Sequence, residues 1–180
     1  MDLHLTHRDG HKVDATIEAA SSQLRSSIER DWRPLLGAND EESVWAFEQL
    51  DEPGNLNFST DVEYALLVAD LQVQALLVTS LPTAPRGLVS ADLVYIEYYA
   101  TAPWNRDPER RWKNVGTFML GWAVRRSRAR GHAGRIGLHS KRQSEGAYKR
   151  RGLTSLGVDG DIDGQHFFLG DALWAAARYP

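Results

Sequence analysis

Cysteine is absent from this chain of 180 residues, which excludes disulfide bonds, thiolate metal sites and a cysteine nucleophile. An excess of basic charge is also missing, since the formal net charge is -3, and nothing in the balance indicates a nucleic-acid partner. No apolar run reaches the length of a membrane span, because Asp70, Gln72 and Gln74 interrupt the longest candidate. Residues 1–12 lack the apolar core of a signal peptide. We therefore expect a cytoplasmic protein without membrane contact.

The composition is that of an ordinary globular protein, with 42% hydrophobic and 25% charged residues. A chain of this length builds one domain with a proper core, so we expect a single domain over residues 1–180. Within it, residues 1–13 are expected to form a mobile or short-strand N-terminus. Residues 171–180 are expected to form a C-terminal tail.

Hydrophobic periodicity predicts helices first and strands afterwards in the first half of the chain. The expected elements are helices over 14–33 and 40–50, strands over 62–69 and 73–81, and one candidate strand over 4–6. Because only Asp70-Leu71-Gln72 separates the two longer strands, they are expected to form an antiparallel hairpin.

The second half alternates between strands and helices. The expected elements are strands over 93–101, 135–139, 153–158 and 166–169, and helices over 115–130, 142–151 and 171–179. A long helix between the first two of these strands makes them a parallel pair with a crossover connection. Ligands of such mixed sheets bind at the carboxyl ends of the parallel strands.

The turn Arg111-Trp112-Lys113-Asn114-Val115-Gly116-Thr117 opens the long helix. It is basic and contains a glycine, and it presents free backbone N–H groups beside the positive end of a helix dipole. These features predict a site for a phosphate or pyrophosphate group. The alternative is that the cations are only the solvent-exposed charges of a loop, and in that case the turn binds no ligand.

Two ordered motifs resemble those of the GNAT acetyltransferase superfamily. The first is Arg111-x-x-Asn114-x-Gly116, where the family pattern has glycine at the Asn114 position. Asn is the non-glycine residue most tolerant of a left-handed backbone, so the replacement is physically coherent. The second is the segment from Tyr148 to Gly152-Leu153, which is similar to the family's Tyr-x-x-x-Gly-Phe. The resemblance covers roughly residues 60–170.

The resemblance implies an α/β fold with a mixed, mostly antiparallel sheet and one central parallel strand pair flanked by helices. It implies an N-acetyltransferase that transfers the acetyl group of acetyl-coenzyme A, or of another acyl-coenzyme A, to a primary amine of a small molecule or peptide. No metal is expected. The residues that it assigns to donor binding are Tyr99, Ala100, Thr101, Arg111, Lys113, Asn114, Val115, Gly116, Thr117 and Ser140.

Two residues are candidates for acid–base chemistry. Glu97 lies mid-strand among tyrosines, and a carboxylate among aromatic rings has a raised pKa that suits a general base. The alternative is an outward-facing Glu on a solvated face. Tyr148 matches the family's tyrosine, which commonly hydrogen-bonds the departing coenzyme A sulfur. The alternative is an aromatic that packs its helix onto the sheet.

Other readings of the chain remain open. The donor can carry a longer acyl chain, with the Trp-bearing loop 103–112 lining a wider pocket, or the domain can bind acyl-coenzyme A without turnover. Exposed aromatic residues near Trp174 and Tyr179 can support a homodimer.

Three further patterns favour structural explanations. The segment from Asp159 to Gly164 copies the start of a calcium loop, but a polar hairpin turn explains it better. The histidines His4, His7 and His11 have ligand-like spacing, yet a mobile tail is the simpler interpretation. The arginines over 125–130 are expected at an exposed helix C-terminus.

Overall fold

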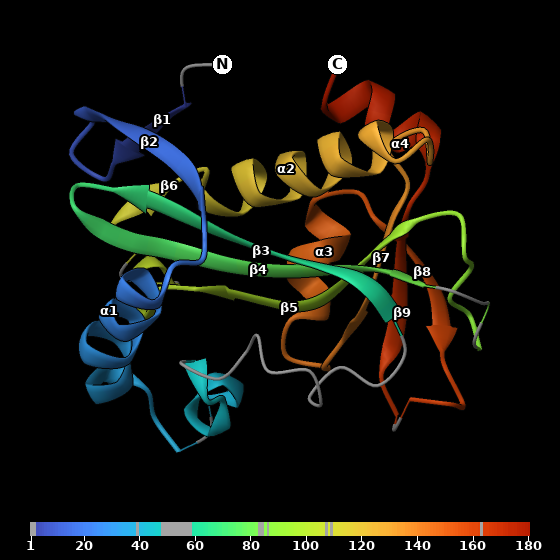
Figure 1. Ribbon diagram of the computed structural model, residues 1–180, viewed down its shortest axis with the longest axis horizontal. Coiled ribbons are helices and arrows are strands. Elements are labelled where there is room, and N and C mark those ends of the chain that lie inside the picture. The colour runs from blue at the N-terminus through green and yellow to red at the C-terminus, as the bar shows by residue number, and fades with distance from the viewer. Residues whose placement is uncertain are drawn as a thin grey trace. The chain divides into compact units, whose positions relative to one another are not determined.

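The computed structural model describes residues 3–38, 40–47, 59–82, 85, 87–106, 108, 110–162 and 164–180. Among these residues, nine strands form one hydrogen-bonded sheet in the order β6-β1-β2-β3-β4-β5-β7-β9-β8 (Figure 1). The strands are β1 (Leu3–His7), β2 (Lys12–Ala19), β3 (Ser59–Ala69), β4 (Gln72–Pro82), β5 (Val94–Thr101), β6 (Trp112–Lys113), β7 (Ile136–Ser140), β8 (Thr154–Val158) and β9 (His166–Gly170).

Four α-helices accompany the sheet in the described part of the chain: α1 (Ser22–Trp32), α2 (Val115–Ala129), α3 (Glu145–Arg150) and α4 (Ala172–Arg178). None of the described helices has the length and apolarity of a membrane span. The strands β5 and β7 pair in parallel, while β1 with β2, β2 with β3, and β7 with β9 pair antiparallel. The expected fold class, a mixed and mostly antiparallel sheet with a parallel pair and flanking helices, is therefore confirmed.

The chain divides into two compact units. The first contains residues 1–57, 64–77 and 98–119, and the second contains 58–63, 78–97 and 120–180. The boundaries fall inside β3, β4, β5 and α2, so these elements supply residues to both units. The expected single domain over 1–180 stays a prediction.

The helix predicted over residues 14–33 is wrong over residues 14–21. Residues 12–19 form β2, which pairs with β1 in a hairpin, and α1 begins only at Ser22. Val13, Ala15 and Ile17 alternate with exposed residues, which is the period of a strand. Ser21 caps α1, because its Oγ accepts a hydrogen bond from the N–H of Leu24 at 3.3 Å. The N-terminal segment is thus a strand hairpin rather than a mobile tail, and the candidate strand over 4–6 is confirmed as part of β1.

The helix predicted over residues 40–50 is a short 3-10 turn over Glu41–Val44, and residues 48–50 lie outside the described part. Arg33 ties this segment to the end of α1. Its guanidinium donates to the carbonyl of Ser43 at 2.6 Å and pairs with Glu29 at 2.8 Å. The carbonyl of Ser43 is thus satisfied by a side chain.

The hairpin predicted around Asp70 is confirmed. β3 and β4 are joined by Asp70 and Leu71, whose φ values of 52° and 59° are both left-handed. Two successive positive φ values are the signature of the type I′ turn, whose twist matches that of the flanking strands.

The remaining predicted elements are confirmed, with shifted ends. Helix α2 connects β5 to β7, and the parallel ladder joins Val94 to Ile136 and Ile96 to Leu138. Helix α3 is shorter than the predicted 142–151, because residues 142–144 form turns. The tail predicted as a short helix is α4, which is capped by the carboxylate of Asp171.

A buried polar chain crosses the second unit from β5 to the β8–β9 connection. The Tyr95 hydroxyl lies 2.7 Å from Nδ1 of His139, and Nε2 of His139 lies 3.1 Å from Oδ2 of Asp159. The Asp159 carboxylate also accepts from the N–H groups of Leu88 at 2.8 Å and Asp161 at 3.0 Å. Burial opposes ionisation of this carboxyl, but these donors outweigh it and hold the pKa of Asp159 below its ordinary value of 3.8.

We predict that Asp159→Ala lowers the free energy of unfolding at pH 7 by about 2–4 kcal/mol, because it leaves buried hydrogen-bond donors without an acceptor. Since the folded-state pKa of Asp159 lies below 3.8, its stabilisation is present above that pH and lost as pH falls through the folded-state pKa. Urea unfolding at several pH values should show the gap between variant and wild type closing in acid. Asp161→Ala, an exposed neighbour, is the control and should change stability by less than about 0.5 kcal/mol. A gap that is absent at pH 7 or constant with pH would contradict the assignment.

Candidate functional site

The turn that opens α2 has the geometry of an anion site. Asn114 has a φ of 68°, in the left-handed region, so the chain changes direction there and enters the helix at Val115. The first helical bond runs from the N–H of Phe118 to the carbonyl of Asn114 at 3.0 Å. Helical geometry leaves the N–H groups of residues 115–117 without an acceptor inside α2, at its positive end.

The side chains of the turn separate into an exposed and a buried set. Lys113, Asn114 and Thr117 are exposed, whereas Val115 and Gly116 are buried. Arg111 is exposed, and its guanidinium carbon lies 5.4 Å from the centre of the Trp104 ring. The cations expected beside a bound phosphate are therefore in solvent contact, while the apolar residues anchor the helix.

The approach to this turn contains a strand that the sequence did not predict. The segment before the turn is predicted as a loop over 103–112, but Trp112 and Lys113 form β6, which pairs with β1 through Thr6↔Lys113 and His7↔Trp112. Alternation along β6 buries Trp112 and exposes Lys113. Two residues are too few to show periodicity, so no sequence signal marks this strand.

A buried side-chain amide fixes the loop before β6. Gln74 on β4 is fully buried, and its Oε1 accepts from Nε1 of Trp104 and Nδ2 of Asn105, both at 2.9 Å. Asn105 in turn accepts the backbone N–H of Trp112 on its Oδ1 at 3.1 Å. The other end of the Gln74 amide donates to the carbonyl of Ala69 at 3.0 Å. Gln74 and Asn105 thus position the chain that leads into the turn.

Sequence reasoning missed the role of Gln74. We used it only as a polar break in an apolar run, although a polar side chain in a strand buried on both faces must find hydrogen-bond partners. That requirement alone predicts that Gln74 takes part in a buried hydrogen-bond network. It did not identify Asn105 as the partner, because the two residues are far apart in sequence.

The β5 residues assigned to donor binding lie beyond the end of the parallel pairing between β5 and β7. The last paired residues are Ile96 and Leu138, and β5 continues to Thr101. Ala100 is buried, and Tyr99 and Thr101 are partly buried.

Glu97 is partly buried and does not stand on a fully solvated face. The hydroxyl of Ser80 on β4 donates to its Oε1 at 2.5 Å. Its carboxylate is therefore oriented by a neighbouring strand, as a positioned base requires. Whether Glu97 acts as a base stays a prediction.

Tyr148 belongs to a helix C-terminus of defined geometry. The N–H of Leu153 donates to the Tyr148 carbonyl at 3.2 Å, and the N–H of Gly152 donates to the Lys149 carbonyl at 2.9 Å. This pair of bonds is the Schellman motif, and it needs the positive φ of 80° that Gly152 adopts. The motif from Tyr148 to Leu153 thus has a backbone reason for its glycine. The Tyr148 ring is buried and lies 5.7 Å from that of Phe168.

Ser140 ends β7 and is buried, and its hydroxyl donates to the carbonyl of Lys141 at 3.0 Å. Glu97, Ser140 and Tyr148 belong to the second unit, whereas the turn residues and residues 99–101 belong to the first. Each group is therefore positioned by its own unit, and the assigned roles stay predictions.

The segment that copies a calcium loop connects the antiparallel strands β8 and β9, as the hairpin interpretation predicts. Its first carboxylate, Asp159, is engaged with His139, and Asp163 lies outside the described residues. Two arginines near the end of α2 pair with Glu63: Arg126 through Nε at 2.5 Å and Arg130 at 2.8 Å. The Arg126 hydrogen bond is the main cause that lowers the pKa of Glu63.

The C-terminal aromatics are less exposed than expected. Trp174 is partly buried, its Nε1 donates to the carbonyl of Arg151 at 2.9 Å, and its ring lies 5.4 Å from that of Tyr179. Leu173 is an exposed large apolar residue of α4, at 82%. A homodimer stays a prediction.

Comparison with known proteins finds similar structures but no match by sequence. No protein-family model matches this sequence, and no curated protein matches it at a significant level. The PaiA N-acetyltransferase from Thermoplasma acidophilum, solved with coenzyme A, superposes with a TM-score of 0.60 at 15% identity, over 87% of this chain and 98% of its own. An acetyltransferase of the GNAT family from Staphylococcus aureus gives 0.58 at 10% identity, over 88% and 99%.

A third similar structure is the aminoglycoside acetyltransferase AAC(6′)-Ib, solved with coenzyme A and kanamycin. Its TM-score is 0.62 at 12% identity, over 91% of this chain and 98% of its own. The chain therefore has the fold of the GNAT acetyltransferases, as the two sequence motifs predicted.

We predict that replacing Asn105 by Ala lowers the free energy of unfolding by about 2–4 kcal/mol. The change leaves the buried Trp112 N–H without its acceptor and removes one of the two donors to Oε1 of Gln74. Gln72→Ala is the control, because Gln72 lies on β4 with Gln74 and its side-chain oxygen has a long 3.5 Å contact with Arg111. Urea unfolding of both variants checks this. Equal stability of Asn105→Ala and wild type would show that the amide chain does not hold the loop.

The left-handed turn residue gives a second prediction. Asn114→Gly should leave the melting temperature unchanged or slightly higher, because glycine adopts a φ of 68° without strain. Asn114→Val should cost about 1–2 kcal/mol, because a β-branched residue is disfavoured in that region. Thermal unfolding of the pair gives the comparison. If both variants melt alike, the left-handed conformation at this position is not required.

Proposed function

We propose that this protein is an acyl-coenzyme A-dependent N-acyltransferase, most simply one that transfers the acetyl group of acetyl-coenzyme A to a primary amine. The observation that carries the proposal is the left-handed Asn114 at the start of the 15-residue helix α2. The fold supports it, because two of the similar structures were solved with coenzyme A.

In this proposal the pyrophosphate of the donor binds at the first turn of α2. The N–H groups of residues 115–117 donate to its oxygens, and the helix dipole favours its negative charge. Lys113 is exposed immediately before Asn114 and supplies a full positive charge. Arg111 supplies a second charge after a small movement from the Trp104 ring.

The amide-bearing arm of the donor binds along β5. The parallel ladder with β7 ends at Ile96, and the five residues from Glu97 to Thr101 continue beyond it. A strand edge of this kind can accept the amides of an extended ligand as an added strand would. Ser140 at the end of β7 is proposed as a further contact.

The proposed chemistry is attack of an amine nitrogen on the thioester carbonyl. A C–N bond forms, the C–S bond breaks, and the sulfur leaves as a thiolate. Glu97 takes the proton from the amine, directly or through water, with its carboxylate oriented by Ser80. The Tyr148 hydroxyl hydrogen-bonds the thiolate and gives it a proton. Because phenols and thiols have ordinary pKa values of about 10 and about 8.5, this transfer is uphill by about 1.5 pKa units, and the phenolate then regains a proton from solvent.

The acceptor is proposed only as an amine-bearing small molecule or peptide. One similar structure holds kanamycin, which supports an amine acceptor as a class. Turnover assays with acetyl-, succinyl- and long-chain acyl-coenzyme A separate the donors. A strict acetyl preference would remove the long-chain alternative.

We predict that Tyr148→Phe lowers the turnover number about 10²-fold while leaving the dissociation constant of coenzyme A unchanged, because the phenol acts only on the leaving group. Calorimetry gives the affinity, and thiol release with an amine panel gives the rate. Tyr179→Phe is the matched control, since it removes a partly buried phenol that has no proposed role.

Unchanged turnover in Tyr148→Phe would remove this residue as the acid. Coenzyme A binding without turnover by the wild type on any amine tested would instead favour the non-catalytic binding module. Failure to bind coenzyme A would overturn the proposal itself.

A further inference from the structure

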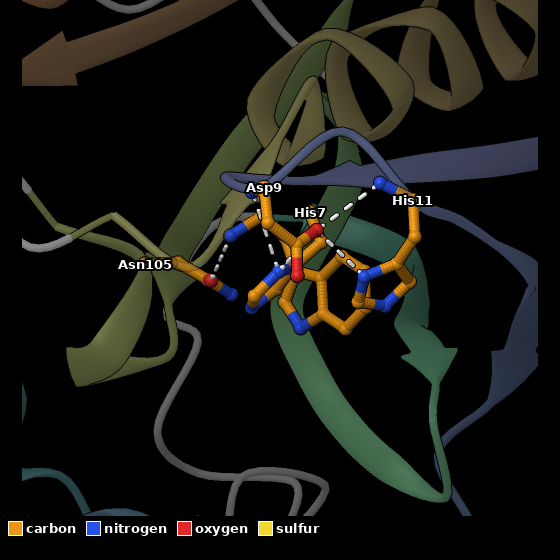
Figure 2. A network of polar contacts seen from close by, with 5 residues as sticks. His7, Asp9, His11 and Asn105 are labelled. Carbon is orange, nitrogen blue, oxygen red and sulfur yellow. Dashed lines mark hydrogen bonds and ion pairs between the residues drawn. The ribbon is translucent and has the colours of Figure 1, made fainter.

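The tip of the β1–β2 hairpin brings two imidazoles and a carboxylate to one point. Figure 2 shows the His7 and His11 side chains turned toward Asp9. Nδ1 of His7 lies 2.8 Å from Oδ1 of Asp9, and Nδ1 of His11 lies 2.7 Å from the same oxygen. All three ligand atoms lie within 4.8 Å of one another.

The backbone fixes the hairpin tip that carries these side chains. The N–H of His7 donates to the His11 carbonyl at 2.8 Å, and the N–H of Gly10 donates to the His7 carbonyl at 3.0 Å. Gly10 has a φ of 100°, which only glycine adopts readily. The hairpin is also tied to the β6 approach, because the N–H of Arg8 donates to the Arg111 carbonyl at 2.9 Å.

A buried tryptophan braces both rings. The His7 and His11 ring centres lie 4.9 Å and 5.5 Å from that of Trp112, both edge-on, and 4.5 Å from each other. Trp112 is itself held by Asn105 through its backbone N–H. The imidazoles are thus oriented before any ligand arrives, which lowers the entropy lost on binding.

The donor set has the chemistry of a zinc-class cation. Two imidazole nitrogens and one carboxylate oxygen suit Zn²⁺, Co²⁺, Ni²⁺ or Cu²⁺, whereas Mg²⁺ and Ca²⁺ prefer oxygen alone. Ligands on a tetrahedral Zn²⁺ are about 3.3 Å apart at bond lengths of about 2.0–2.1 Å. The observed separations of 2.7 and 2.8 Å therefore need to open by only about half an ångström.

Solvent reaches the three side chains, so a water molecule can complete the coordination of a bound cation. The side chains of Asp9 and His11 are 59% and 53% exposed, and that of His7 is 20% exposed. Three protein ligands with an open fourth position are typical of zinc sites that keep a water molecule.

We propose that Nδ1 of His7, Oδ1 of Asp9 and Nδ1 of His11 bind one zinc-class divalent cation, with water as the fourth ligand. The proposal departs from the expectation of no metal, because that expectation treated the segment as a mobile tail. It also leaves His4 out of the set, since Nδ1 of His4 pairs with Asp14 at 2.8 Å. The site is independent of the acyltransferase proposal.

Calorimetric titration of the full chain with ZnSO₄ tests the site. We expect one ion per chain in wild type, and an affinity at least about tenfold weaker in both His11→Ala and Asp9→Asn. His4→Ala is the matched control, because it removes a histidine from the same hairpin without touching the three ligands. Circular dichroism of each variant verifies that the hairpin variants fold.

Titration with Co²⁺ gives a second readout that does not depend on stability. Its visible absorption should report a low-coordinate site in wild type and in His4→Ala, and the signal should be lost in the double variant His7→Ala, His11→Ala. Absence of Zn²⁺ binding by wild type, or equal binding by wild type and the double variant, would overturn the proposal.

Discussion

The hydrogen bond between the side-chain amides of Gln74 and Asn105 is the constraint on which the turn at the start of α2 depends. Gln74 lies in a strand segment that is otherwise apolar and buried, where an unbonded amide would be costly. Its oxygen binds Trp104 and Asn105, and Asn105 holds the backbone N–H of Trp112. Trp112 then sets the pairing of β6 with β1, and two residues later the chain turns into α2. The position of an exposed turn is thus fixed by a fully buried side chain.

The residues proposed for chemistry are positioned by the same principle, in which local hydrogen bonds orient groups that a hydrophobic core alone would leave loose. Glu97 is oriented by the hydroxyl of Ser80. Tyr148 lies in the last turn of a helix closed by Gly152 in its left-handed conformation. The polar chain through His139 and Asp159 links β5, β7 and the β8–β9 connection. Side chains that are held in place by such hydrogen bonds are what acid–base catalysis requires.

Periodicity predicted the elements that are long or strongly patterned: the β3–β4 hairpin, the parallel pair and α2. It failed for β2, because Ile17 and Ala20 continue the spacing of α1 and hide a change of period at Ser21. It missed β6, which is two residues long and exists only because β1 offers a partner. The β1–β2 hairpin was missed because the residues from Asp14 onward were predicted as a helix, whereas they continue the second strand of the hairpin. Contacts between residues distant in sequence, such as Gln74 with Asn105, have no local signal.

The central claim is that the first turn of α2 binds the pyrophosphate of an acyl donor. Its most direct test is an NMR titration of ¹⁵N-labelled protein with coenzyme A, following the backbone amide resonances. If the pyrophosphate binds there, the amides of residues 115–117 should show saturable downfield shifts, and much smaller shifts when pantetheine, which lacks the pyrophosphate, is added. Coenzyme A binding that leaves these three amides unshifted would contradict it.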